Sequence, residues 1–178
     1  DLVAISNGLK NTSKIGMGHT RWATHGVPSD KNSHPHVSNN GKIALVHNGI
    51  IENYDTIKTM LINKNFEFHS ETDTEVLANL IQYFMDKEPT LEFSEAVRYA
   101  LNEVYGAYAI SVMHDDFPGQ LIVARLGSPL AVGIGENEYF VASDASPFVE
   151  FTKEAVYLEE GHMATISLES GIGIRTIK

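Results

Sequence analysis

The chain has 178 residues, of which 43% are hydrophobic and 20% charged, a composition typical of a globular domain and unlike that of a disordered or collagen-like chain. Asp and Glu number 23 against 13 Lys and Arg, and the formal charge of −10, without a basic block, argues against nucleic acid or an anionic membrane as a partner. There is no cysteine, which excludes disulfides, thiolate metal sites and a cysteine nucleophile within these residues. No apolar run is long enough to span a bilayer. The absence of cysteine and of a secretory signal favours a cytoplasmic location.

The first part of the chain, to about residue 51, predicts short strands joined by loops. Strands are expected over residues 15–24 and 42–48, and Asn40-Gly41 is a strong turn signal before the second of them. Residues 26–33 contain Pro, Ser, Asp and Asn, which indicates a surface loop between the two strands.

The middle of the chain predicts helices. In residues 74–87 the apolar side chains recur at helical spacing, and Thr72 with Glu75 forms a T-x-x-E capping box at the start of that segment. Residues 91–104 repeat the helical spacing, and a shorter helix is expected over residues 54–63.

The last third predicts antiparallel strands. Residues 107–114 and 120–126 flank a turn at Pro118-Gly119 and are expected to form a hairpin. Further strands are expected over residues 129–135, 138–143, 155–158, 163–168 and 172–177. Strands, then helices, then many strands indicate a single α+β domain in which helices cover sheet layers, and the glycine-rich turn of a nucleotide-binding βαβ fold is missing.

Five of the eight histidines lie between positions 19 and 47, so a metal site has to be considered. Their spacing matches no standard zinc pattern. His34 and His36 flank a proline that favours an extended chain and could place both on one side, but no third ligand is evident. We therefore expect surface or hydrogen-bonded histidines, and neither a metal nor another cofactor.

The segment from His19 to Gly26 carries a candidate binding group. In a strand, Arg21 would share one face with His19, and Trp22 would lie on the other. An arginine at the end of a strand, beside a Gly- and Pro-containing loop, is placed to hold a carboxylate through its bidentate fork. The alternative is a structural salt bridge of Arg21, with Trp22 filling the core.

Two further segments could complete a site. Asn48 and Gly49 end an apolar strand, where a side-chain amide and a backbone N–H can point at a developing oxyanion, although Asn-Gly is more often only a turn. Asp73 lies in the first turn of a predicted helix, where either its charge suits the helix dipole or it faces a substrate ammonium. In the second case Arg21 and Asp73 would recognise both ends of an α-amino acid, and the set still supplies no nucleophile.

The order of the motifs resembles that of one family. The motifs, in chain order, are G-H-T-R-W-A-T-H-G, H-P-H, V-H-N-G-I-I-E-N, S-E-T-D-T-E, G-A-Y, A-R-L-G-S-P-L, A-S-D and L-E-E-G, and they span nearly the whole chain. The sequence closely resembles the glutaminase domains of glucosamine-6-phosphate synthases, which are class II glutamine amidotransferases, and R-W-A-T-H-G looks specific to this hexosamine branch.

The resemblance implies an N-terminal-nucleophile (Ntn) hydrolase fold, which is a four-layer αββα sandwich with antiparallel sheets. It implies that the thiol of an N-terminal cysteine attacks the side-chain amide of L-glutamine, with the α-amine of the same residue as base, and that glutamate and ammonia are released. In full-length members the ammonia passes to a sugar-isomerase domain, which converts fructose 6-phosphate to glucosamine 6-phosphate.

Carried over by motif, the resemblance gives seven residues a role. Arg21 is expected to pair with the α-carboxylate of glutamine, and Asp73 with its α-ammonium. Asn48 and Gly49 match the oxyanion-hole pair. Three further residues line the glutamine pocket or close over it: Trp22, Thr24 and His25. The remaining histidines of these motifs are given no catalytic step: His19, His34, His36 and His47.

The chain departs from the family at its start, where the family opens Cys-Gly-Ile and this sequence opens Asp1-Leu2-Val3-Ala4. We therefore expect residues 1–178 to be one amidotransferase domain, N-terminally incomplete, without the isomerase domain and inactive alone. Expected partners are L-glutamine and the sugar-isomerase domain of the same full-length chain, with a homo-oligomer formed through that domain. Two alternatives stay open, namely a non-catalytic glutamine-binding or assembly module and another class II amidotransferase.

Overall fold

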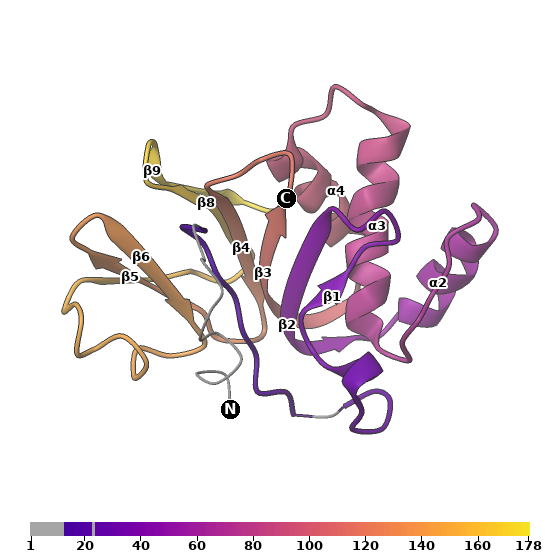
Figure 1. Ribbon diagram of the computed structural model, residues 1–178, viewed down its shortest axis with the longest axis horizontal. Coiled ribbons are helices and arrows are strands. Elements are labelled where there is room, and N and C mark those ends of the chain that lie inside the picture. The colour runs from indigo at the N-terminus through magenta and orange to yellow at the C-terminus, as the bar shows by residue number, and fades with distance from the viewer. Residues whose placement is uncertain (1–12, 23) are drawn as a thin grey trace.

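A computed structural model describes residues 13–22 and 24–178 of the chain. These residues form two β-sheets that pack against each other, and helices cover the opposite face of the larger sheet (Figure 1). All strand pairs within the two sheets are antiparallel. The predicted α+β sandwich with antiparallel sheets is confirmed.

The larger sheet has the strand order β1-β2-β3-β4-β8-β9 in the described chain. Its strands are β1 (His36–Val37), β2 (Ile43–Ile51), β3 (Gly106–His114), β4 (Gln120–Leu126), β8 (His162–Ser167) and β9 (Gly171–Thr176). β1 is only two residues long and pairs with Ala44 and Leu45 of β2. Beyond Leu45, the edge of β2 is therefore not covered by a described strand.

The smaller sheet consists of β5 (Ala131–Gly135), β6 (Glu138–Ala142) and β7 (Ala155–Tyr157), in the order β6-β5-β7. Val132 of β5 and Val123 of β4 belong to one buried apolar cluster between the two sheets. On the other face, Phe148 is buried so close to Gly133 that an added Cβ would lie 2.7 Å from its ring. In the described residues this face of the smaller sheet carries the turns around Phe148 and no helix.

The helical layer is formed by α2 (Tyr54–Ile62), α3 (Asp73–Lys87) and α4 (Phe93–Glu103), and a short 3-10 turn, η1 (Asp30–Asn32), precedes β1. α3 contacts α2, α4 and β2 (Figure 1). Its residues from Asp73 to Gln82 are all buried, so its first turn is packed as firmly as its middle. In the part of the chain that the structure describes, no helix is long and apolar enough to cross a membrane.

The strand predicted over residues 15–24 is wrong. Its described residues form no strand, Arg21 has a left-handed φ of 49°, and Trp22 is 90% exposed. A strand needs a neighbour for its backbone hydrogen bonds, and no described strand pairs with this segment. Residues 14–18 instead run between the two sheets, beside Val46 of β2 and Val141 of β6 (Figure 1). The other predicted helices and strands are all found, with small shifts at their ends.

The capping box at the start of α3 is only half formed. The hydroxyl of Thr72 accepts a hydrogen bond of 3.3 Å from the backbone N–H of Glu75, as predicted. The Glu75 carboxylate, however, accepts hydrogen bonds from the backbone N–H groups of His69 (2.8 Å) and Ser70 (2.7 Å). Glu75 therefore ties the loop before the helix to its first turn, and this fixes where Asp73 stands.

Candidate active site

A cavity of about 240 Å³ lies at the N-terminal end of α3, beside the open edge of β2. All seven residues that the sequence singled out line it: Arg21, Trp22, Thr24, His25, Asn48, Gly49 and Asp73. Pockets for drug-sized ligands usually have ~300–1,000 Å³, so this one suits a ligand as small as a free amino acid.

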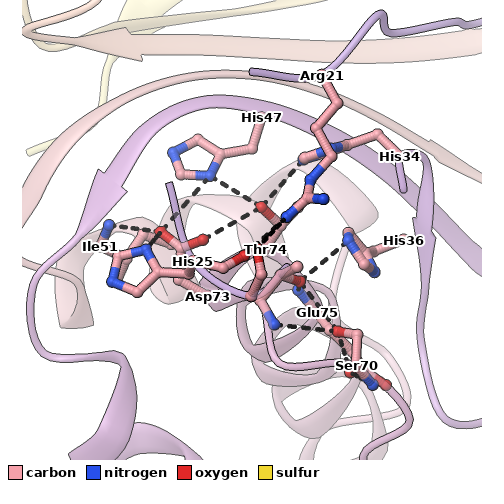
Figure 2. A network of polar contacts seen from close by, with 12 residues as sticks. Arg21, His25, His34, His36, His47, Ile51, Ser70, Asp73, Thr74 and Glu75 are labelled. Atoms are coloured by element: carbon pink, nitrogen blue, oxygen red, sulfur yellow. Dashed lines mark hydrogen bonds and ion pairs between the residues drawn. The ribbon is translucent and has the colours of Figure 1, made fainter. Parts of the chain in front are cut away.

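The negative charge of the cavity is the carboxylate of Asp73, the first residue of α3. It is 3% exposed, and its Oδ2 accepts a hydrogen bond of 2.8 Å from the backbone N–H of Ile51 (Figure 2). His25 and His47 each place Nδ1 3.9 Å from the same oxygen. The partial positive charge of the helix N-terminus stabilises an anion here. The Asp73 carboxylate retains lone pairs for a cation in the cavity.

The positive charge of the cavity is the guanidinium of Arg21. It donates hydrogen bonds to the backbone carbonyls of His25 (2.8 Å), Gly26 (3.1 Å) and Val27 (3.3 Å). In the described chain it forms no ion pair, so the interpretation of Arg21 as a structural salt bridge is wrong. Carbonyl oxygens orient a guanidinium without neutralising it, which leaves its charge for a carboxylate ligand.

The loop that supplies these carbonyls is fixed to the start of α3 by Asn32. The Asn32 amide is fully buried, donates to the Val27 carbonyl and a Glu71 carboxylate oxygen, and accepts from the Glu71 backbone N–H. The hydrogen bond from the Asn32 amide to the Glu71 carboxylate lowers the pKa of Glu71, because it stabilises the charged form of that carboxyl. A Cβ at Gly26 would lie 2.6 Å from the Asn32 amide nitrogen, so the loop needs glycine there. Two segments far apart in sequence thus position Arg21.

Asn48 and Gly49 lie on β2 beyond the end of β1. Gly49 has a φ of 130°, and a Cβ there would approach the Ala107 carbonyl oxygen to 2.0 Å, so only glycine fits. The Asn48 side chain is exposed, and its Oδ1 lies 2.6 Å from Nε2 of His19. Within the described residues its Nδ2 has no protein partner, so this donor is available to a ligand.

Histidines gather beside Thr74 (Figure 2). Nε2 of His34 and Nδ1 of His47 each lie 3.1 Å from the Thr74 hydroxyl oxygen, and the rings of His34 and His36 are 5.0 Å apart. Burial, aided by the neighbouring His19, lowers the pKa of His34 to about 3, and burial also lowers the pKa of His36 and His47. These three rings are neutral hydrogen-bonding groups near pH 7. No group of three His, Cys, Asp or Glu side chains in the described chain could hold a metal ion.

The surroundings of the predicted residues differ from expectation in two ways. Trp22 is 90% exposed at the cavity, so the alternative in which it fills the core is wrong. Thr74 also lines the cavity, and its hydroxyl contacts two histidines, although Thr74 was not predicted as a site residue. The sequence feature that could have identified Thr74 as a site residue is its position next to Asp73 in the S-E-T-D-T-E motif. The roles of all these residues toward a ligand stay predictions.

Comparison with known proteins shows the family of the chain. The sequence profile described as glutamine amidotransferase domain matches residues 6–169. The chain belongs to this family. It is 54% identical over 153 residues to glutamine–fructose-6-phosphate aminotransferase (isomerizing) of Bacteroides thetaiotaomicron, a match that covers 86% of this chain and 25% of that protein. The protein of the same name from Chlorobaculum tepidum is 47% identical over 170 residues, which cover 96% of this chain and 28% of that protein. The chain thus spans about a quarter of the length of these relatives.

Solved structures of amidotransferases share the fold of the chain. The glutamine phosphoribosylpyrophosphate amidotransferase from B. subtilis, complexed with ADP and GMP, superposes with a TM-score of 0.73 and 31% identity over 90% of this chain and 34% of that one. A structure described as the allosteric regulatory enzyme of purine biosynthesis gives a TM-score of 0.70 and 29% identity, over 83% of this chain and 32% of that one. These neighbours are Ntn hydrolases, so the predicted Ntn hydrolase fold is confirmed.

Proposed function

We propose that this amidotransferase domain binds L-glutamine in the cavity and takes part in its hydrolysis to glutamate and ammonia. The observation that carries the proposal is that one cavity holds the guanidinium of Arg21, which has no ion-pair partner in the described chain, and the buried carboxylate of Asp73. A free α-amino acid carries the opposite two charges on one carbon atom. Arg21 then binds the α-carboxylate and Asp73 the α-ammonium. A glutamine within a peptide has neither charge and would leave both groups unpaired, which disfavours it as a ligand.

With the α-carbon held in this way, the side-chain amide of glutamine is directed at Asn48 and Gly49. Attack on its carbonyl carbon places negative charge on the oxygen, and the Asn48 Nδ2–H and Gly49 N–H are the donors that would stabilise it. The nucleophile implied by the family resemblance is a thiol, which lies outside these residues because the 178 include no cysteine. The C–S bond forms, the amide nitrogen leaves as ammonia with the thiol proton, and water cleaves the thioester. Trp22, Thr24 and His25 enclose the substrate.

The names of the relatives support wider proposals for the whole protein. In it, the ammonia would convert fructose 6-phosphate to glucosamine 6-phosphate on a sugar-isomerase domain of the same chain. Residues 1–178 would then form the amidotransferase domain. A homo-oligomer through the isomerase domain and a cytoplasmic location are predictions from the sequence alone.

The test is ammonia release by the full-length protein, for which the family resemblance implies an N-terminal cysteine. The ammonium of a lysine side chain cannot form the two parallel hydrogen bonds that the Arg21 guanidinium offers a carboxylate. Arg21→Lys should therefore lower kcat/KM for L-glutamine by about ten- to hundredfold, the equivalent of one charge-assisted hydrogen bond. For 4-aminobutanamide, which is glutamine without the α-carboxylate, the same variant should match the wild type. Arg98→Lys on α4, outside the cavity, is the matched control.

Two results would contradict this assignment. An unchanged kcat/KM for glutamine in Arg21→Lys would remove Arg21 from the site. Glutamine binding by the wild type without any ammonia release would instead identify the non-catalytic binding module that the sequence left open.

A further inference from the structure

The amide of Asn48 can present either of two chemical groups to the cavity. Its side chain is exposed, and an exposed amide can rotate so that the oxygen and the nitrogen exchange places. Only the nitrogen can donate a hydrogen bond to an oxyanion, whereas the oxygen would repel it. The proposed function therefore needs a contact that selects one orientation of Asn48.

The hydrogen bonds of His19 make that selection. The backbone N–H of Arg21 can only donate, and it lies 2.8 Å from Nδ1 of His19, so Nδ1 is an acceptor. The neutral ring then carries its proton on Nε2, which donates to Oδ1 of Asn48 at 2.6 Å. Rotating the amide would set the Asn48 NH₂ group against an N–H donor and lose this bond.

The ring of His19 is itself held in place. It packs against the ring of His34 with a centroid distance of 4.3 Å, and His34 is hydrogen-bonded to Thr74 in the first turn of α3. Burial keeps His34 uncharged, with a pKa of about 3, so no cation stands against the His19 ring near pH 7. A chain of contacts thus runs from the helix N-terminus through two rings to Asn48.

We propose that His19 is a positioning residue, which holds the Asn48 amide with its Nδ2–H₂ directed at the developing oxyanion. This inference rests on the proposed glutamine hydrolysis. His19 itself touches no reacting atom. The same backbone N–H of Arg21 that fixes the ring tautomer belongs to the residue proposed to bind the substrate carboxylate, so glutamine binding and oxyanion stabilisation share one support.

The test uses two substitutions of His19 in the full-length protein. Glutamine places its amide nitrogen about where Nε2 stands and can still donate to Asn48, whereas asparagine reaches only as far as Nδ1. His19→Asn should therefore lower kcat for glutamine hydrolysis, by at least about tenfold and at most the ~10²–10³ expected for Asn48→Ala, with KM unchanged. His19→Gln should retain most of the wild-type kcat. His69→Asn, an exposed histidine outside the cavity, is the control.

A double variant separates positioning from a general structural role. If His19 acts through Asn48, then His19→Asn combined with Asn48→Ala should be no slower than Asn48→Ala alone. Additive losses, an unchanged kcat in His19→Asn, or a raised KM with lowered thermal stability would each overturn the proposal. Absence of ammonia release by the wild type would count against the proposed function instead. In that case NMR of the His19 imidazole still decides, since the Nε2–H tautomer supports the inference and the Nδ1–H tautomer refutes it.

Discussion

Replacing Asp73 by Asn removes the negative charge of the cavity while changing the shape of the side chain very little. The Asn oxygen can still accept the 2.8 Å hydrogen bond from the Ile51 N–H, so the first turn of α3 keeps its link to β2. The fold loses the interaction of the charge with the helix N-terminus, which is worth up to ~2 kcal/mol away from solvent, and the contacts of the charge with His25 and His47 at 3.9 Å. We therefore expect the free energy of unfolding to fall by no more than about 2 kcal/mol, and substrate use to change in a way that depends on the α-amine.

The size of the second effect follows from burial. A hydrogen bond to a charged group contributes ~1.5–3 kcal/mol, and about 1.4 kcal/mol is a factor of ten, so kcat/KM for L-glutamine should fall about ten- to hundredfold. The carboxylate is 3% exposed, so solvent screens it little and the upper part of that range applies. Glutaramate, which is glutamine without the α-amine, should lose nothing in the variant, and the preference for glutamine over glutaramate should shrink by the same factor.

The assay is ammonia release from both substrates by the full-length protein, beside urea unfolding of the wild type and the variant. Asp116→Asn makes the same chemical change at an exposed ion pair with Lys42, outside the cavity, and should leave both substrates unaffected. An equal loss for glutamine and glutaramate would refute the reasoning, because Asp73 would then shape the cavity without touching the α-amine.

Two predictions concern stability. Gly49→Ala forces a Cβ to within 2.0 Å of the Ala107 oxygen and should lower the free energy of unfolding in urea by at least ~2 kcal/mol. Gly41→Ala, also at positive φ but with open space around it, should lower it by less. Equal losses for the two variants would mean that the clash with Ala107 does not matter. Acid should also destabilise the fold, because burial lowers the pKa of His34 from 6.5 to about 3 and, between these values, the unfolded chain binds a proton that the folded chain does not. The free energy of unfolding should thus fall as pH drops below 6.5, by at most ~1.4 kcal/mol per pH unit for this ring. His34→Gln should reduce this dependence of the unfolding free energy on pH, measured by urea unfolding at pH 7 and pH 5. An unchanged pH dependence would show that His34 is not the group responsible.

The elements from residue 42 onward could be predicted because each is encoded locally. α3 carries its own apolar spacing and a Thr72 cap, β2 begins with an apolar run after the Asn40-Gly41 turn signal, and β3 is mostly apolar. The segment over residues 15–24 was also predicted as a strand, but it has no strand partner in the described chain. Whether such a segment becomes a strand depends on a neighbour, and local pattern does not supply one.

The site shows the same division between local and distant information. The motifs identified Arg21 and Asp73, which do line one cavity. Their orientation depends on contacts that no motif states, since the Arg21 loop is held by the pair of Asn32 and Glu71, 39 positions apart.

Hydrogen-bond partners are the least predictable feature because a polar side chain has several acceptable choices. Glu75 matches a capping box in sequence, yet its carboxylate serves the two N–H groups of the preceding loop. His19 matches no catalytic pattern, yet the direction of its two hydrogen bonds follows uniquely from the Arg21 N–H being unable to accept. The residue types therefore indicate which groups can form a hydrogen bond, and the fold determines which of them are partners and which group donates.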